Sequence, residues 1–369
     1  MAQRVVISTQ IQQSLTEAVG RVPHDKLFIL TDETTQRLCF PVVADLPCLK
    51  NVNHIVIPTT DTHKTLDTLA QVWTELGNKG GTRHSLMICL GGGMVTDLGG
   101  FAASTFKRGI PYINIPTTLL SMVDASVGGK TGINFNGLKN EIGVFNEADT
   151  VILDTIFLRT LDTENLLSGF AEMLKHGLIS NRKHLTELLQ CPIGSKSFTV
   201  ENSNLHELIS CSVSIKESVV AKDPHEQGLR KALNLGHTVG HAFESFMLSH
   251  SEGSSSPSSE GDQRKGSPFL HGYAVAFGMV CELYLSCVKC GFPTETMRQV
   301  VQFIREHYGT LSYTCDDYPT LYELMTHDKK NTADSINFTL LADVGELRLN
   351  QTATREEIYE ALDFLREGL

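Results

Sequence analysis

The chain has 369 residues, of which 41% are hydrophobic and 20% charged, and its formal net charge is −11. This length exceeds one ordinary hydrophobic core and predicts two domains. An acidic balance without a long basic run excludes nucleic acid as a general partner, and no apolar stretch is long enough to indicate a membrane partner.

The first 157 residues alternate apolar runs with a helical pattern. Thr65–Leu76 carries apolar residues at a helical period. Short buried strands are expected at Lys26–Thr31, His54–Pro58, Ser85–Leu90, Tyr112–Ile115 and Thr150–Leu153. This alternation predicts an α/β domain over residues 1–157, with a Rossmann-like, mostly parallel sheet whose ligand binds beyond the carboxyl ends of the strands.

A glycine triplet, Gly91–Gly93, follows one of these strands directly. Glycines let the backbone approach a bound group closely, and the N–H groups at the start of the following helix can hold a diphosphate. Cationic residues follow the triplet at Lys107, Arg108, Lys130 and Lys139. The segment therefore predicts a nucleotide-like cradle for an anionic ligand.

From residue 158 to residue 369 the pattern indicates an all-α domain. Strand signals are nearly absent there. Amphipathic segments are expected to form helices at Leu166–Ile179, Leu205–Ala221, His237–Met247, Gly272–Cys287, Thr294–His307 and Arg355–Arg366. The serine-rich stretch 249–268 cannot pack a core and is expected to be a mobile surface loop.

Two histidines at i and i+4, His237 and His241, share one helical face, as zinc ligands often do. Glu172 could supply the carboxylate that such a pair needs, and Lys175 and His176 lie on the same helical face as Glu172. The alternative is that these three are solvated helix charges, but apolar neighbours limit the exposure of that face. Taken alone, His271 more often indicates the first residue of a helix than a ligand.

Together these segments resemble the 3-dehydroquinate synthase family, within the sugar-phosphate cyclases. The resemblance covers Thr31–Asn331 and is densest in four segments: 91–145, 169–179, 216–244 and 271–279. It implies NAD on the N-terminal domain and a divalent metal, Zn²⁺ or alternatively Co²⁺, on the C-terminal domain, with the substrate between them. We also expect a homodimer.

The resemblance assigns roles residue by residue. The metal ligands become Glu172, His237 and His271, so that His241 contacts the substrate instead. The NAD site would use Asp32, Asp61, Lys64, Gly92, Gly93, Asp97, Thr117, Thr118, Leu120, Asp124, Lys139 and Thr160. The substrate site would use Arg108, Asp124, Lys130, Asn140, Lys175, Lys216, Arg230, Asn234 and His241, with Lys329 or Lys330.

Four positions depart from the family pattern. Asp61 stands where Glu is common and Thr34 where Asn is common, both near the expected adenosine end of NAD. Thr96 and Leu138 each replace a glycine. These changes are expected to alter cofactor affinity. None of them removes a group that the chemistry needs.

The implied reaction converts a phosphorylated sugar acid, 3-deoxy-arabino-heptulosonate 7-phosphate, to 3-dehydroquinate and phosphate. Its steps are transient NAD-dependent oxidation, β-elimination, reduction and intramolecular aldol closure, in the shikimate pathway to chorismate and aromatic amino acids. A sibling cyclase and an NAD- and metal-dependent alcohol dehydrogenase remain alternatives. Arg230, Asn234 and His241 favour a substrate with a carboxylate. Nine cysteines, an odd number, suit a reducing cytoplasm.

Overall fold

The computed structural model describes residues 3–136, 138–253, 269–326 and 336–368. The chain divides into two compact units, one of residues 1–162 and 198–217 and the other of residues 163–197 and 218–369. The boundary expected after residue 157 stays a prediction. Most of the serine-rich stretch 249–268 lies outside the described residues, as do Lys329 and Lys330.

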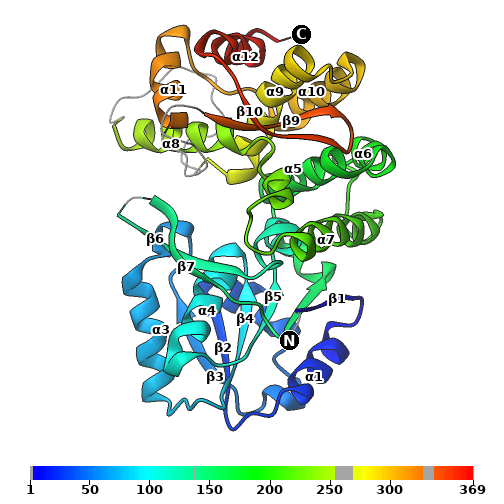
Figure 1. The fold of residues 1–369 in the computed structure, drawn as a ribbon. Helices are drawn as coiled ribbons and strands as arrows, with labels where there is room; N and C mark the ends of the chain where they lie inside the picture. The colour runs from blue at the N-terminus through cyan, green and yellow to red at the C-terminus, as the bar shows by residue number, and fades with distance from the viewer. Residues whose placement is uncertain (1–2, 137, 254–268, 327–335, 369) are drawn as a thin grey trace. The chain divides into compact units, whose positions relative to one another are not determined.

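A six-stranded sheet forms the centre of the first unit (Figure 1). Its order is β1-β8-β5-β4-β2-β3, and every neighbouring pair is parallel. The strands are β1 (Arg4–Ser8), β2 (Leu27–Asp32), β3 (Asn53–Ile57), β4 (Leu86–Gly91), β5 (Tyr112–Pro116) and β8 (Thr150–Asp154). The expected parallel α/β architecture is confirmed, and β1 adds an edge strand that the sequence analysis missed.

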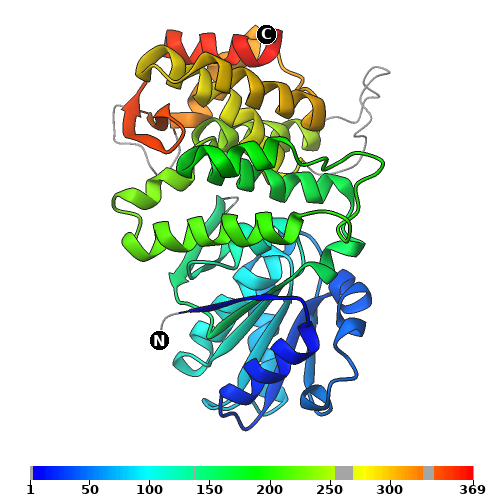
Figure 2. The same cartoon turned by 90° about the vertical axis from the view of Figure 1, so that its right-hand side faces the viewer.

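Helices cover both faces of this sheet. Figures 1 and 2 together show α1 on one face and α3 and α4 on the other. An antiparallel hairpin of β6 (Lys130–Phe135) and β7 (Leu138–Phe145) packs against α4. The helices are α1 (Ile11–Arg21), α2 (Glu33–Leu38), α3 (Leu66–Asn78) and α4 (Gly93–Thr105), with short turns η1 (Phe40–Val42), η2 (Pro47–Leu49), η3 (Asp61–His63), η4 (Phe106–Arg108), η5 (Ser121–Ala125) and η6 (Thr155–Thr160).

The second unit is mainly helical, as expected. Its helices are α5 (Thr163–Ser180), α6 (Arg182–Leu189), α8 (His237–Gly253), α9 (His271–Cys290), α10 (Thr294–Tyr308), α11 (Tyr318–Thr326) and α12 (Arg355–Glu367), with turns η7 (Leu229–Asn234) and η8 (Cys315–Asp317). Helix α7 (Leu205–Lys222) begins in the first unit and ends in the second.

The second unit also contains an antiparallel hairpin, which corrects the expectation that strands are nearly absent there. Strands β9 (Asn337–Asp343) and β10 (Glu346–Thr352) are joined by Val344 and Gly345. Gly345 has φ +81°, a conformation that glycine adopts easily in tight hairpin turns. A buried apolar run such as β9 carries no periodicity that separates a strand from a helix, so only the glycine turn could have indicated it.

Helix α9 is the core of the second unit and packs against α5, α8, α10, α12 and β9. Within the described part of the chain it is the one helix long and apolar enough to cross a membrane. However, 72% of its most apolar 18-residue stretch is buried inside the protein. The composition of α9 is therefore that of a core helix.

Helices α8 and α9 approach each other so closely that a glycine is needed at their contact. A Cβ atom added at Gly278 would lie 2.0 Å from the carbonyl oxygen of Gly236, which is backbone and cannot rotate away. We expect Gly278→Ala to lower the free energy of unfolding by about 3 kcal/mol, the upper end of ordinary overpacking costs. Urea unfolding would measure the change.

Gly20→Ala in α1 is the matched control, because an added Cβ there meets nothing within 4 Å. This variant should be neutral or more stable by up to about 1 kcal/mol, since alanine favours a helix over glycine. If both variants unfolded at the same urea concentration, the close approach of α8 and α9 would be contradicted.

Candidate active site

Three side chains in the second unit converge on one point. Glu172 comes from the middle of α5, while His237 and His271 are the first residues of α8 and α9. The Oε1 atom of Glu172 lies 3.6 Å from Nε2 of His237 and 3.5 Å from Nε2 of His271. Glu172 is fully buried, and its Oε1 accepts no hydrogen bond from the described residues.

The outer nitrogens of both imidazoles point at acceptors. Nδ1 of His237 lies 3.2 Å from the carbonyl oxygen of Leu235, and Nδ1 of His271 lies 3.2 Å from Oε1 of Glu244. A proton on each Nδ1 would satisfy these acceptors and leave each Nε2 as a lone-pair donor. Both lone pairs then face the carboxylate oxygen of Glu172.

This arrangement fits a divalent cation. In a tetrahedral zinc site with bonds of about 2.1 Å, two ligand atoms lie about 3.4 Å apart. The two distances from the Glu172 oxygen, 3.5 and 3.6 Å, are close to that value. The donor set of two imidazoles and one carboxylate is also one that catalytic zinc sites use, with a position left for substrate.

The surrounding charges favour the ionised carboxylate. Burial by itself would raise the pKa of Glu172, but the Lys175 ammonium beside it and His271 outweigh burial and hold that pKa below its usual range. For His271, burial disfavours the charged form and by itself would lower the pKa, but the nearby carboxylates of Glu244 and Glu172 raise that pKa to about 10. A cation that binds His271 therefore displaces a proton.

His241 lies beside this trio, and a second grouping is possible. Its ring centroid is 5.4 Å from that of His237 and 6.2 Å from that of His271. Ligand atoms of His241, Glu244 and His271 also lie within 4.8 Å of one another, as do those of Glu172, His237 and His271. His237 and His241 do lie on one face of α8. In the trio with Glu172 and His237, however, the third ligand is His271 of α9 and not His241.

Arg230 and Asn234 come from η7, and an acidic loop holds them. The carboxylate of Asp223 accepts the backbone N–H of Arg230 at 2.9 Å, and Nη1 of Arg230 donates to the carbonyl of Pro224 at 2.6 Å. Nδ2 of Asn234 donates to Oε1 of Glu226 at 2.7 Å. Glu226 was not among the predicted site residues; its φ of +58° is rare for a residue with a side chain and marks a tight turn.

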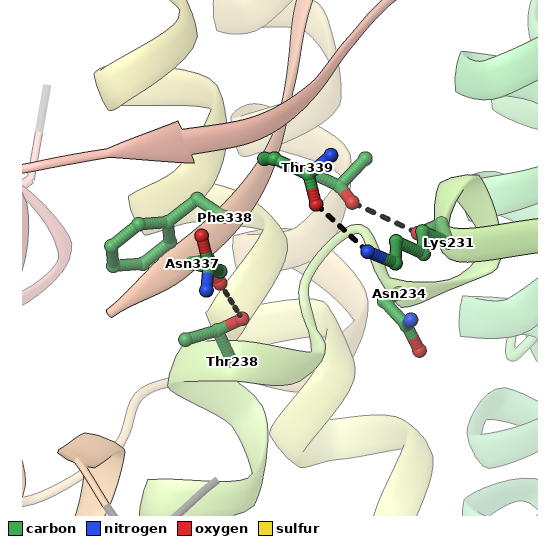
Figure 3. Close-up of a pocket in the computed structure, with 7 residues that line it drawn as sticks. Lys231, Asn234, Thr238, Asn337, Phe338 and Thr339 are labelled. Carbon is green, nitrogen blue, oxygen red and sulfur yellow. Dashed lines mark hydrogen bonds between the residues drawn. The ribbon is translucent and has the colours of Figure 1, made fainter. Parts of the chain in front are cut away.

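A small pocket next to Asn234 shows how the β9–β10 hairpin supports this region (Figure 3). The hydroxyl of Thr339 donates to the carbonyl of Lys231 at 2.8 Å, and the hydroxyl of Thr238 donates to the carbonyl of Asn337 at 3.0 Å. Strand β9 therefore fixes both η7 and the first turn of α8, which carries His237.

In the first unit, the expected cofactor residues gather at one edge of the sheet. Neighbouring parallel strands β5, β4, β2 and β3 end at Pro116, Gly91, Asp32 and Ile57, so their carboxyl ends share that edge. The residues placed there are Thr117 and Thr118 after β5, Gly92 and Gly93 after β4, Asp32, and Asp61 and Lys64 after β3. Leu120 lies just before η5, and Thr160 ends η6 after β8.

The start of α4 suits an anion. Gly92 is its N-cap and offers no side-chain bond, and the first turn of the helix holds no acidic residue. Backbone N–H groups at a helix start have no partner within the helix and carry partial positive charge. Asp32 instead caps α2, because its Oδ1 accepts the N–H of Thr35 at 2.8 Å. The donors at this edge fit the phosphates of a dinucleotide.

Charged contacts join several of the expected residues. Nζ of Lys64, which is buried, donates to Asp97 and to Asn140. Burial raises the pKa of Asp97 although the Lys64 ammonium opposes this shift. Lys139 lies 3.9 Å from Asp61. In the same unit, Nζ of Lys216 donates to the carbonyl and carboxylate oxygens of Asp124.

Two further expected substrate residues, Arg108 and Lys130, are located by their positions in the first unit. Arg108 follows α4 and precedes β5, so it sits at the amino-terminal edge of the sheet, opposite the glycine triplet. Lys130 pairs with Phe145 at the start of β6. The backbone N–H of Asn140 donates to Oδ1 of Asn134, which lies four residues further along β6, roughly 14 Å away at strand spacing. The structure does not bring either residue to Asn140, so their roles stay predictions.

The departures from the family pattern have local partners. The hydroxyl of Thr34 lies 3.3 Å from that of Thr59, and the hydroxyl of Thr96 donates to the carbonyl of Gly93 at 3.1 Å. Oδ2 of Asp61 accepts from Nδ2 of Asn134 at 3.3 Å. Leu138 is 54% exposed. The effect of these residues on cofactor affinity stays a prediction.

Comparison with known proteins agrees with this picture. A family model described as 3-dehydroquinate synthase N-terminal matches residues 54–168, and one described as 3-dehydroquinate synthase C-terminal matches residues 169–331. The 3-dehydroquinate synthase of Parabacteroides distasonis is 52% identical over 366 residues, which cover 99% of this chain and 98% of that protein. The chain belongs to the 3-dehydroquinate synthase family.

Solved structures share the fold of this 3-dehydroquinate synthase family member. The 2-epi-5-epi-valiolone synthase of Streptomyces hygroscopicus, solved with NAD⁺ and Zn²⁺ bound, has a TM-score of 0.82 and 24% identity, over 99% of this chain and 97% of that one. A 2-deoxy-scyllo-inosose synthase, complexed with carbaglucose-6-phosphate, NAD⁺ and Co²⁺, has a TM-score of 0.76 and 22% identity, over 100% of this chain and 96% of that one. At these identities the likeness concerns the fold alone.

Proposed function

We propose that this chain converts 3-deoxy-arabino-heptulosonate 7-phosphate to 3-dehydroquinate and phosphate, as a carbon–oxygen lyase of the shikimate pathway. The observation that carries the proposal is its 52% identity, over nearly the full length of both chains, to a 3-dehydroquinate synthase. The two sibling cyclases of known structure described above are 24% and 22% identical to it. Cationic side chains expected for this chemistry are present in both units, and the metal-ligating side chains in the second.

Glu172, His237 and His271 are the proposed ligands of a divalent cation, Zn²⁺ or Co²⁺. The orphaned buried oxygen of Glu172 and the orientation of both imidazoles support this assignment. The proposed NAD residues are those at the carboxyl edge of the sheet, with Asp97, Asp124 and Lys139. When bound, the cation would supply a Lewis acid for a substrate hydroxyl and NAD a hydride acceptor that returns the hydride, so no net oxidation results.

The side chains of the chain itself bind and orient the substrate. Arg230 is proposed to hold the carboxylate, since a guanidinium forms paired hydrogen bonds with it. Asn140, Lys175, Lys216 and Asn234 are proposed to bind phosphate and hydroxyl oxygens, and Lys329 or Lys330 to join them. The His241 imidazole is proposed to accept a proton at one ring nitrogen and to donate one from the other.

A turnover assay tests the proposal. Purified protein with zinc, the heptulosonate phosphate and NAD well below the substrate concentration should release phosphate until the substrate is consumed. NAD should be unchanged at the end, because its oxidation and reduction steps cancel. Phosphate determination and NADH absorbance measure these two quantities, and the product should be identified as 3-dehydroquinate. Stoichiometric accumulation of NADH without phosphate release would instead support an alcohol dehydrogenase.

We further propose that the enzyme acts in the cytoplasm as a homodimer. The nine cysteines and the phosphorylated metabolite substrate support the first point. Light scattering of the purified protein would test the second.

A further inference from the structure

Two buried carboxylates, Glu244 and Glu282, lie next to the proposed metal ligands and had no role in the sequence analysis. Glu244 on α8 is 5% exposed, and Glu282 on α9 is fully buried. Burying a carboxylate costs several kcal/mol unless hydrogen bonds or charges compensate it. Two such groups at one helix contact therefore call for a physical explanation.

Each carboxylate contacts the start of the other helix. Glu244, in the second turn of α8, places Oε1 3.2 Å from Nδ1 of His271, the first residue of α9. Glu282, in the third turn of α9, accepts the backbone N–H of Gly236 at 2.7 Å and that of Thr238 at 3.2 Å. These two N–H groups flank His237, the first residue of α8.

The close contact between α8 and α9 explains how each carboxylate can reach the start of the other helix. Gly240 and Gly278 let the two backbones approach, since an added Cβ would lie 3.0 Å from the Ala274 carbonyl oxygen and 2.0 Å from the Gly236 carbonyl oxygen, respectively. Glu244 and Glu282 each follow one of these glycines by four residues, so they lie on the same helix faces. The chain pairs a glycine and a carboxylate on each helix.

We infer that Glu244 and Glu282 are positioning residues that hold the two histidines in the geometry of the metal site, an inference that rests on the proposed function. Glu244 acts on the His271 ring, because it accepts from Nδ1 and turns Nε2 toward Glu172. Glu282 acts on the backbone, because a carboxylate at a helix start satisfies N–H groups that have no partner within the helix. The two carboxylates thus set the ring of one ligand and the main chain of the other.

Both roles predict weaker zinc binding, and the conservative glutamine variant of Glu244 tests the role of its charge. Outer carboxylates of this kind are typically worth 10- to 100-fold in metal affinity. We expect Glu244→Ala to weaken zinc binding by about that factor and also to lower the thermal midpoint of the metal-free protein, because it removes the buried partner of the His271 ring. Glu244→Gln keeps an acceptor without the charge and should lose less. Glu282→Gln should lower the thermal midpoint of the metal-free protein as well as the zinc affinity.

Zinc affinity is measured by competition with a chromophoric chelator, and the visible spectrum of the Co²⁺-loaded protein reports the ligand geometry. Both readouts are independent of turnover. Glu323→Gln, an exposed carboxylate on α11, is the matched control and should leave both unchanged. We expect the Co²⁺ spectrum to shift in Glu244→Ala and to return toward the native spectrum in Glu244→Gln.

The inference is overturned if Glu244→Ala and Glu282→Gln bind zinc as tightly as the native protein and show its Co²⁺ spectrum. That result would leave the proposed reaction standing. A native protein that binds zinc but does not turn over the heptulosonate phosphate would contradict the proposed reaction and not the positioning roles. A native protein that binds no zinc would overturn the inference.

Discussion

Glu172→Ala and His271→Ala are expected to yield protein without bound zinc, whereas His241→Ala is expected to keep zinc and lose turnover. The Glu172 oxygen lies 3.6 Å from Nε2 of His237 and 3.5 Å from Nε2 of His271, so removing any one of the three leaves two ligands. His241 is expected to move protons instead, a contribution of about 10²- to 10⁴-fold in rate.

Metal analysis of the purified variants, followed by steady-state kinetics with added zinc, measures both effects. His206→Ala, on α7, is the control for substitution of a histidine outside the proposed site residues and should change neither quantity. Two outcomes would contradict the assignment. Loss of zinc in His241→Ala with retention in Glu172→Ala would place the metal on His241, Glu244 and His271, and retention in His271→Ala would favour the i,i+4 pair.

Arg230→Lys is expected to lose most of the activity on the heptulosonate phosphate. The Arg230 side chain is 2% exposed, and its contact with the carbonyl of Pro224 fixes its orientation. An ammonium is a point charge and cannot reproduce the paired contact of a planar guanidinium with a carboxylate. Each charge-assisted hydrogen bond that is lost should cost roughly 1.5–3 kcal/mol of transition-state stabilisation.

The ratio of kcat/KM between native enzyme and variant measures this loss. Arg298→Lys, an exposed conservative change on α10, is the matched control and should be silent. The native enzyme should also prefer the heptulosonate phosphate to sedoheptulose 7-phosphate, which lacks the carboxylate. Equal or faster turnover of sedoheptulose 7-phosphate would assign the chain to a sibling cyclase. It would also contradict the proposed role of Arg230 in binding a substrate carboxylate.

The sequence by itself determined the elements that local patterns encode. Apolar runs bounded by turns located β2, β4 and β5, and a helical period located α3, because burial on one face leaves its period in the chain. The glycine triplet marked the end of β4. The edge strand β1 and the β9–β10 hairpin were not predicted. A short strand is hard to tell from other short segments by its sequence alone, because much of its stability comes from pairing within the sheet.

Only the tertiary structure decided which side chains meet. The spacing of His237 and His241 predicts a shared helical face, but it says nothing about what that face meets. His271 lies 34 residues beyond His237, and it reaches Glu172 because α8 and α9 pack closely at Gly240 and Gly278. The positions of Glu244 and Glu282 follow from the same contact. A carboxylate on one helix becomes a partner for the other only when their backbones are close enough for hydrogen bonds, and that closeness is a property of the packed pair.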